Sequence, residues 1–574
     1  MLGNEAIAQA CLEAGVSVAT TYPGTPSSEI GAVLEARKHE TGLYFEISTN
    51  EKVALEVAAA AAVSGLRSFV FFKHVGLNVA SDPFVSLGYN GVRAGMVVLT
   101  ADDPSLHSSQ NEQDSRYYAR LALLPMFEPS TPAEAHAMVK QAFDLSERLE
   151  VPVIVRTSTR VNHARGIVEV GEVKQAKQKG SFEKDPSRFV LVPANARRER
   201  LQQLDRMKIA SAMAEESPLN FVAGEGAIGV IASGVAFTYV REHLKGVKVL
   251  KLGFSHPLPE RMIERFIAPL ETVIVAEELS PLLELEVTRL AKTVNPKLKV
   301  IGKLSGHLPF AFEYSPDTLR GLKASVETDL PERPIEFEEI KLPPRPPVLC
   351  AGCPHRATFY AVRKALGKRR AVFSTDIGCY TLGLNPPMSM ADYLLCMGSS
   401  VGAASGFSQA IDDKVIAYIG DSTLFHSGIP GIANAVFNDH RFLLVILDNG
   451  TTAMTGHQPT PGTGRSQDIP CKCIDIEAVV RGCGVEDVST VDPYDIKGTT
   501  AVFSKVLGSD SLSVVISRRV CPLANKKKGA TRPAAFAVDQ DKCVGCKTCI
   551  VQFTCPALAF DGKNVRILAE ACSG

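Results

Sequence analysis

The 574-residue chain lacks three features that would place it in other classes of protein. It has no excess charge of either sign, since Lys plus Arg and Asp plus Glu both total 62, whereas nucleic-acid-binding proteins usually carry a basic excess. Its longest apolar stretches, such as Val53–Val63 and Phe442–Leu447, are well short of the ~20 residues of a membrane-spanning helix. It opens Met-Leu-Gly-Asn-Glu, without the basic and apolar regions of a secretory signal. These absences predict a cytoplasmic protein that binds neither nucleic acid nor membrane.

Cysteine, by contrast, is plentiful, with fourteen residues. Structural disulfides are rare in a reducing cytoplasm, so clustered cysteines there indicate metal or redox chemistry. Cys11, Cys396 and Cys483 stand in apolar or helical surroundings and are expected to be core thiols. Cys471 and Cys473 receive no role, and the remaining nine cysteines fall into two groups.

Alternation of short β-branched runs with helical stretches predicts several α/β domains, with parallel sheets covered by helices on both faces. Lys and Arg are frequent in one connecting segment, and Pro in another. The predicted order is an α/β domain at 1–171, a basic connection at 172–215, a second α/β domain at 216–326, a stiff Pro-rich linker at 327–348, a third α/β domain at 349–523 and a Cys-rich tail at 537–574.

Two segments of the third domain directly follow predicted strands, Gly-Asp-Ser-Thr from Gly420 and Asp-Asn-Gly-Thr from Asp448. Ligands of doubly wound sheets bind beyond the carboxyl ends of the strands. Gly420 allows the backbone to approach a phosphate closely. Oxygens of Asp421, Asn449 and Thr451, completed by diphosphate oxygens, form the hard ligand set that suits Mg²⁺.

This spacing resembles the thiamine-diphosphate motif, with Ser422 where that motif has its second glycine. A helix starting after Ser427–Gly428 is expected to point its N-terminus at the same anion. The alternative is a capped turn followed by an unrelated Asp-Asn-Gly turn.

A thiamine enzyme also needs a Glu against the aminopyrimidine ring, so that the cofactor's own amine can deprotonate the thiazolium carbon. Glu51 is the first choice because it opens an Ala-rich helix predicted over Glu51–Val63, and Glu56 is the second. The alternative for either is ordinary complementation of the helix dipole. Upstream, two prolines and a glycine in Thr21–Glu29 fix a rigid turn. In that turn Thr25 either presents its hydroxyl to a substrate carboxylate or is purely structural.

The tail carries Cys543, Cys546 and Cys549, each separated by two residues, and then Cys555 followed by proline. Three thiolates on a tight turn can hold three corners of an iron–sulfur cubane, and a zinc site is the alternative. Five residues separate the third and fourth cysteines, where three are usual. Cys572 reads like the first member of a second run, so we expect either a truncated tail or one with fewer clusters.

Together these segments resemble the 2-oxoacid:ferredoxin oxidoreductases, and among them the large (alpha) subunits of the indolepyruvate type, over essentially the whole chain. The likeness is carried by Gly3–Ala6, Tyr22–Glu29, Cys350–Arg356 and Asp421–Gln458. It implies a pyrimidine-binding first domain, a second domain like the C-terminal domain of transketolase and a diphosphate-binding third domain. The implied fold class is therefore α/β, with several doubly wound thiamine-diphosphate-binding-type domains and a small C-terminal ferredoxin-like iron–sulfur domain.

The resemblance implies oxidative decarboxylation of an aryl pyruvate, with coenzyme A, to an aryl acetyl-CoA and CO₂, with ferredoxin as electron acceptor. It implies Thr25 as the residue that contacts the substrate. It also implies an inner [4Fe–4S] cluster close to the thiazolium ring, and ordinary buried thiols are the alternative for its ligands. The implied ligands are Cys350, Cys353, Cys379 and Cys521.

Further assignments follow from the resemblance. Met454 is expected beside the cofactor, and His457 either carries a proton or caps a turn. Arg116 or Arg120 is a candidate for holding the substrate carboxylate, with a surface arginine as the alternative for each. No domain for coenzyme A is evident, and the family's small (beta) subunit supplies a missing domain, so an α₂β₂ assembly is expected.

Three functional classes compete. The first is the thiamine-dependent 2-oxoacid oxidoreductase, whose substrate is an aryl pyruvate or another 2-oxoacid such as pyruvate, 2-oxoglutarate or a branched-chain acid. The second is a non-oxidative thiamine decarboxylase or carboligase, which has no need of the tail cysteines. The third is a non-catalytic electron-transfer or scaffold protein, against which the matched halves of a thiamine site argue.

Overall fold

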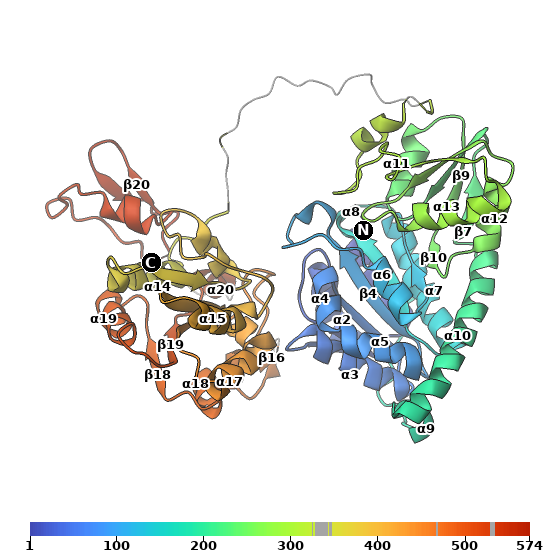
Figure 1. Cartoon of the computed structure of the whole chain (residues 1–574). Helices are drawn as coiled ribbons and strands as arrows, with labels where there is room; N and C mark the ends of the chain where they lie inside the picture. The colour runs from blue at the N-terminus through green and yellow to red at the C-terminus, as the bar shows by residue number, and fades with distance from the viewer. Residues whose placement is uncertain (324, 328–342, 344–346, 467–468, 528–533, 574) are drawn as a thin grey trace. The chain divides into compact units, whose positions relative to one another are not determined.

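The computed structural model describes residues 1–323, 325–327, 343, 347–466, 469–527 and 534–573. The chain divides into two units, Met1–Ile340 and Lys341–Gly574 (Figure 1). The first unit holds two α/β sheets, and the second holds a third sheet and the Cys-rich tail. Most of the predicted linker at 327–348 lies outside the described residues.

The first sheet has seven strands in the order β10-β5-β6-β4-β3-β1-β2. All neighbours are parallel except β10 and β5. Every residue of β3, β4 and β6 is buried, which is why these strands read as near-continuous apolar runs. The strands are β1 Val18–Thr21, β2 Tyr44–Ile47, β3 Ser68–Lys73, β4 Met96–Asp102, β5 Met126–Phe127, β6 Val153–Ser158 and β10 Phe254–His256.

Eight α-helices accompany the described part of this sheet. The longest, α7, begins at Pro132 behind the N-cap Thr131, whose hydroxyl accepts the Glu134 N–H at 3.2 Å. The helices are α1 Gly3–Glu13, α2 Ser28–Thr41, α3 Glu51–Val63, α4 His74–Val79, α5 Ser81–Asn90, α6 Arg116–Ala122, α7 Pro132–Leu149 and α8 Thr159–His163.

The second sheet, also in the first unit, has five strands in the order β12-β11-β8-β9-β7, of which β7 is antiparallel to β9. After β9 the chain returns to the first sheet and adds β10 to its edge, so the two sheets are directly joined. Two helices, α9 Pro186–Phe189 and α10 Pro193–Glu216, connect the domains. The further elements are β7 Asn220–Ala223, β8 Ile228–Ala232, β9 Val247–Leu252, β11 Thr272–Ala276, β12 Lys299–Ile301, α11 Ala236–His243, α12 Glu260–Ile267 and α13 Leu282–Val294.

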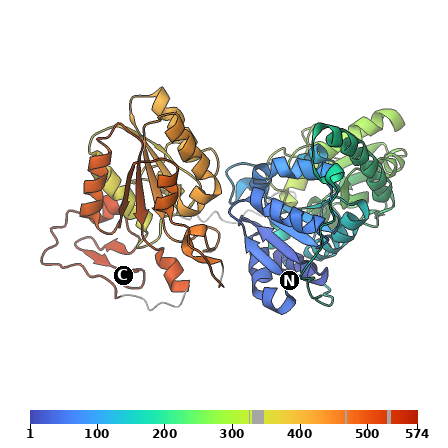
Figure 2. The same ribbon diagram turned by 90° about the horizontal axis from the view of Figure 1, so that it is seen from below.

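The third sheet has five parallel strands in the order β13-β14-β15-β19-β18. Alternate strand residues serve two cores: Ile416 and Tyr418 pack with α14 and α19, and Val415, Ala417 and Ile419 pack with α15, α17 and α18. Figure 2 shows this sheet with helices on both sides. The elements are β13 Ala371–Ser374, β14 Lys414–Gly420, β15 Leu443–Asp448, β18 Asp487–Val491, β19 Ser513–Arg518, α14 Pro354–Leu366, α15 Ser399–Ala410, α17 Ile429–Phe437, α18 Ile476–Gly482 and α19 Ile496–Val506.

The helix α17 begins at Ile429, directly after Ser427–Gly428 as predicted. Its start is not a free helix terminus, however, because the short α16, Asp421–Thr423, and a π-helical turn, Leu424–Gly428, lead continuously into it. The free N–H groups of this helix stand at Asp421 itself, directly after the strand.

The tail is small, and it contains a π-helical turn, Cys549–Phe553, and a two-stranded antiparallel sheet of β20 Leu558–Phe560 and β21 Val565–Ile567. The prediction of core thiols holds for Cys11, which is fully buried, but Cys396 is exposed on a loop and the prediction for it is wrong. In the described residues, no helix has the length and apolar character needed to cross a membrane.

Candidate active site

In the first unit, Thr25 and Glu51 lie beyond the carboxyl ends of neighbouring strands. Thr25 is in the turn between β1 and α2, and Glu51 is the first residue of α3. Asn50 caps α3 by accepting the Val53 N–H at 2.9 Å. The Glu51 side chain is 7% exposed and packs on Gly76 so closely that a Cβ added there would be 2.7 Å from the Glu51 Cγ. A residue larger than glycine at position 76 would therefore displace the Glu51 side chain.

The Thr25 turn is anchored from the N-terminus of the chain. The fully buried Asn4 donates from Nδ2 to the carbonyl oxygen of Pro26 and to Glu29, both at 2.7 Å. Asn162 in turn donates to the Asn4 side-chain oxygen at 2.6 Å. This gives a physical role to the Gly-Asn pair that opens the chain: its asparagine holds the turn that carries Thr25.

A buried lysine that sequence reasoning missed lies beside the same turn. Lys73 ends β3 and packs its stem on Gly24, where an added Cβ would lie 3.2 Å from the Lys73 Cβ. Burial lowers the pKa of its ammonium to about 8, although the carboxylate of Asp103 opposes the change. The only sequence signal was a lysine at the end of an otherwise apolar strand.

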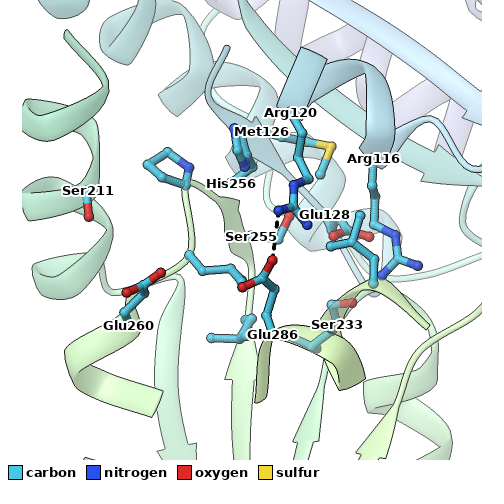
Figure 3. A pocket seen from close by; sticks show the side chains of 15 residues that line it. Arg116, Arg120, Met126, Glu128, Ser211, Ser233, Ser255, His256, Glu260 and Glu286 are labelled. Atoms are coloured by element: carbon cyan, nitrogen blue, oxygen red, sulfur yellow. Dashed lines mark ion pairs between the residues drawn. The ribbon is translucent and has the colours of Figure 1, made fainter. Parts of the chain in front are cut away.

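The two arginines predicted as possible substrate ligands are engaged by protein carboxylates. Arg116 is 2% exposed and pairs with Asp114 at 2.7 Å and with Glu277 at 2.5 Å. Arg120 pairs with Glu286 at 2.7 Å in the lining of a cavity of about 180 Å³ (Figure 3). Arg116 thus links the first α/β domain to the second and is not exposed to bind a substrate.

In the second unit, the predicted diphosphate and metal residues come together beyond β14 and β15. Asp421, Asn449 and Thr451 are 3%, 7% and 5% exposed. The Thr451 N–H is held by the Asn449 Oδ1 at 3.2 Å and also acts on Asp421. Burial, and then the charge of Asp448, raise the pKa of Asp421 to about 8. Its Oδ2 is buried without a hydrogen-bond partner among the described residues, as expected of an oxygen that awaits a cation.

Other residues of the motif line this edge. The Ser422 hydroxyl accepts from the Thr452 hydroxyl at 2.9 Å, which ties the two loops together. Gly420 packs on the Tyr380 ring, and a Cβ added at Gly420 would lie 2.8 Å from a carbon of that ring. Met454 is 53% exposed, and His457 has a left-handed φ of 70° and donates its N–H to the Thr452 carbonyl oxygen at 3.0 Å.

A histidine outside the predicted set also belongs to this region. His355, near the start of α14, is 3% exposed and has its Nε2 3.3 Å from the Asn449 amide nitrogen. Burial lowers the pKa of His355 to about 4, so the imidazole is neutral near pH 7 and can accept from the Asn449 amide. This contact leaves the Asn449 side-chain oxygen turned away from His355, where it accepts the Thr451 N–H.

The four cysteines of the predicted inner set lie close together. Burial, and then the neighbouring Cys521, raise the pKa of the Cys350 thiol. Burial, with Cys350 and Cys379 adding to it, raises the pKa of Cys353 to about 12. The same cause, with Cys521 and Cys350, raises the pKa of Cys379 to about 11. The backbone N–H of Cys521 donates to the Asn449 carbonyl oxygen at 3.0 Å, so the four cysteines adjoin the loop that carries Asn449.

The tail packs on the same end of the third domain. Arg356 donates to the Thr554 hydroxyl at 2.8 Å and to the Phe553 carbonyl oxygen at 3.2 Å. Across the described residues, no three His, Cys, Asp or Glu side chains form a metal-binding group. The ligand sets of the inner cluster and of the tail, Cys543, Cys546, Cys549, Cys555 and Cys572, therefore stay predictions.

Two family models match the chain. Residues 9–216 match the model described as pyruvate flavodoxin/ferredoxin oxidoreductase, thiamine diP-binding, and residues 376–517 match thiamine pyrophosphate enzyme, C-terminal TPP binding domain. A solved 2-oxoglutarate:ferredoxin oxidoreductase from Magnetococcus marinus is 15% identical over 56% of this chain and 64% of its own, with a TM-score of 0.44.

Curated relatives match at full length. Indolepyruvate oxidoreductase subunit IorA of Methanothermobacter thermautotrophicus is 51% identical, that of Archaeoglobus fulgidus 43% and that of Pyrococcus horikoshii 42%, each over 100% of this chain and 94% of the relative. The chain is thus a thiamine-diphosphate-binding oxidoreductase of the 2-oxoacid:ferredoxin type, and it belongs to the family of indolepyruvate oxidoreductase subunit IorA.

Proposed function

We propose that the chain oxidatively decarboxylates aryl pyruvates such as indolepyruvate and phenylpyruvate. The 2-oxoacid and coenzyme A give an aryl acetyl-CoA, CO₂ and a proton, and two electrons pass to ferredoxin. The observation that carries the proposal is the 3.0 Å bond from the Cys521 N–H to the Asn449 carbonyl oxygen, which joins the four-thiol group to the loop of the cofactor's metal. A non-oxidative thiamine decarboxylase has no use for such a neighbour. The aryl substrate is supported by the names of the relatives.

The cofactor residues follow the geometry of each unit. Oxygens of Asp421, Asn449 and Thr451 hold Mg²⁺ with the diphosphate, while Gly420 and Ser422 lie along it. When bound, thiamine diphosphate supplies a nucleophilic carbon and an electron sink. The fit is supported by the buried Asp421 oxygen that lacks a partner among the described residues.

Glu51 takes the aminopyrimidine side, where Gly76 leaves it room. Thr25 offers its hydroxyl to the substrate carboxylate, and Met454 and His457 line the pocket from the loop after Thr451. Glu51→Ala is expected to abolish turnover while iron content stays at the parent's value. Unchanged turnover would move the catalytic carboxylate elsewhere.

Electrons leave through iron–sulfur clusters. The inner [4Fe–4S] cluster is held by the four neighbouring thiols, and the tail cysteines hold at least one more. Anaerobic iron and sulfide analysis of Cys350→Ala tests the inner set, with the exposed Cys396→Ala as the matched control. Iron equal to the parent's in Cys350→Ala would remove this set from the ligand list.

A small beta subunit completes the enzyme as a cytoplasmic α₂β₂ assembly and supplies the domain for coenzyme A. The deciding assay is anaerobic reduction of ferredoxin or a redox dye by the chain co-expressed with that subunit. Indolepyruvate, phenylpyruvate, pyruvate and 2-oxoglutarate are each supplied with and without coenzyme A. A preference for pyruvate or 2-oxoglutarate, or turnover that ignores coenzyme A, would overturn the aryl-pyruvate assignment, and full activity of the purified chain alone would overturn the partner.

A further inference from the structure

Among the residues that the structure describes, Lys73 is a buried cation with no carboxylate in contact. Lys73 is 9% exposed. In that part of the chain, its ammonium donates a hydrogen bond to the Ser108 carbonyl oxygen at 2.7 Å. Lys251, which is also buried, instead forms a salt bridge with Glu134. Burying an ammonium away from water is costly unless an anion or several acceptors compensate. Lys73 therefore lacks the carboxylate partner that compensates for the burial of Lys251.

The nearest acidic group does not serve as that partner. Asp103 accepts hydrogen bonds from the Ser108 N–H at 2.9 Å, from the Ser109 hydroxyl at 2.6 Å and from the Thr159 hydroxyl at 2.8 Å. Both of its carboxylate oxygens are thus in use, and it acts on Lys73 only through space. An ammonium carries three donors, so this one keeps donors for a further acceptor.

The position of Lys73 indicates which acceptor that is. β1 and β3 are adjacent parallel strands, with Thr21 paired to Phe71, so the turn after β1 and the end of β3 meet at one edge of the sheet. The Lys73 stem packs on Gly24, the residue before Thr25. Ser108 joins the two residues, since its hydroxyl donates to the Thr25 carbonyl oxygen at 3.3 Å and its own carbonyl oxygen accepts from Lys73.

The carboxylate of Glu51, proposed as catalytic, packs on a residue that is close to Lys73 in the sequence. Gly76, which packs on Glu51, follows Lys73 by three residues at the start of α4. The ammonium, the Thr25 turn and Glu51 therefore gather around the carboxyl ends of β1 and β3, where ligands of such sheets bind. Both arginines considered for the substrate are already paired, Arg116 with Asp114 and Glu277 and Arg120 with Glu286.

We propose that Lys73 binds the carboxylate of the 2-oxoacid substrate, beside Thr25, as the cation of the substrate site. This rests on the proposed function only in that the substrate is a 2-oxoacid, and it holds for any member of that class. The bond between the carboxylate carbon and the keto carbon breaks, its electron pair stays with the cofactor-bound fragment, and the carboxylate leaves as neutral CO₂. The ion pair with Lys73 thus exists before this step and disappears with it. Removing the Lys73 ammonium should therefore weaken binding of the 2-oxoacid.

The test uses Lys73→Met and Lys73→Arg in the holoenzyme co-expressed with its small subunit, and Lys52→Met, an exposed lysine of the same domain, as the matched control. Loss of a hydrogen-bonded charge is expected to raise KM for the 2-oxoacid by about 10- to 100-fold in Lys73→Met. Lys73→Arg should restore part of the affinity, and Lys52→Met should equal the parent.

A binding measurement separates this role from a structural one. Lys73→Met should weaken binding of 3-phenylpropionate, a carboxylate without a keto group, by about the same 10- to 100-fold. Binding of the neutral 3-phenylpropionamide, and thiamine diphosphate content, should stay within about twofold, which a merely misfolded variant would not show.

The outcomes are distinguishable from those of the proposed function. If the parent prefers 2-oxoglutarate or pyruvate, the aryl-pyruvate proposal fails while Lys73 is tested on that acid in the same way. An unchanged KM for the preferred 2-oxoacid in Lys73→Met overturns the assignment of Lys73. Equal weakening of the carboxylate and the amide overturns it too, because the effect would then not depend on charge.

Discussion

Arg116 offers the sharpest test of how the first unit is held together. Its guanidinium bridges Asp114 and Glu277 and donates to the carbonyl oxygens of Glu278 at 3.0 Å and Ser280 at 2.7 Å. Arg116→Met keeps the volume and the apolar stem but removes all of these bonds. The change would leave two carboxylates buried without their cation, at the junction of two α/β domains.

The magnitude follows from what remains. Asp114 has a side chain 3% exposed, and Glu277 is 1% exposed. Removing one partner of a buried ion pair costs about 3–5 kcal/mol. Glu277 keeps the N–H groups of Leu283 and Glu284, both at 2.8 Å, so we expect the lower end, about 3 kcal/mol. For a domain of 150–250 residues, that lowers Tm by roughly 6–12 °C.

Scanning calorimetry can measure this shift without the tryptophan fluorescence that the chain, with no Trp, does not provide. Arg120→Met is the control, because the Arg120 side chain is 46% exposed and an exposed ion pair is worth only about 0–1 kcal/mol. The double variant Arg116→Met, Glu277→Gln should recover part of the loss. If Arg116→Met melts within about 2 °C of the parent and instead raises KM for the 2-oxoacid, Arg116 contacts substrate and our reasoning is refuted.

Three further predictions concern the two halves of the site. Gly76→Ala places a Cβ 2.7 Å from the Glu51 Cγ and should lower turnover by about 100-fold at unchanged iron content, and normal turnover would show that this contact relaxes. Asp421→Asn should abolish the rise in Tm that Mg²⁺ with thiamine diphosphate gives the parent, and a retained rise would exclude Asp421 as a ligand. Lys73 has a pKa of about 8 in the folded chain, against 10.5 for an ordinary lysine. Below pH 8 its amine is therefore protonated in both the folded and the unfolded chain, and the full free-energy cost of burying its charge lowers stability. Between pH 8 and 10.5 the unfolded state binds more protons and stability should rise with pH, by up to about 3 kcal/mol; calorimetry across this range should show the rise in the parent and not in Lys73→Met.

The sheet strands could be predicted from the sequence because parallel strands buried on both faces contain near-continuous apolar runs. Phe69–Phe72 lies within β3, and Val415–Ile419 lies within β14. The helix predicted over Glu51–Val63 has those bounds in the structure, since Asn50 caps its start. Apolar runs and helix caps were thus enough to predict these elements from the sequence.

Long-range charge pairing was beyond such reasoning. Nothing near Arg116 in the sequence points to Glu277, which is 161 residues away and reaches it only because β10 joins the two sheets. The start of the helix at Asp421 was missed for a local reason. Ser427–Gly428 followed by Ile-Pro looks like a helix N-terminus, yet the π-helical turn carries the helix through it.

The topology of the third sheet explains why the metal loop and the thiols meet. Asp421 follows β14, Asn449 follows β15, Cys379 follows β13 and Cys521 follows β19, and all these strands are parallel. Parallel strands end at one edge, so residues spread over more than a hundred positions are brought together by one rule. The helix α14, which runs back toward the start of β13, brings Cys353 to that edge as well. If the proposed cluster is bound there, it would need no separate domain to reach the cofactor, because the same sheet edge would carry both the diphosphate loop and the cluster ligands.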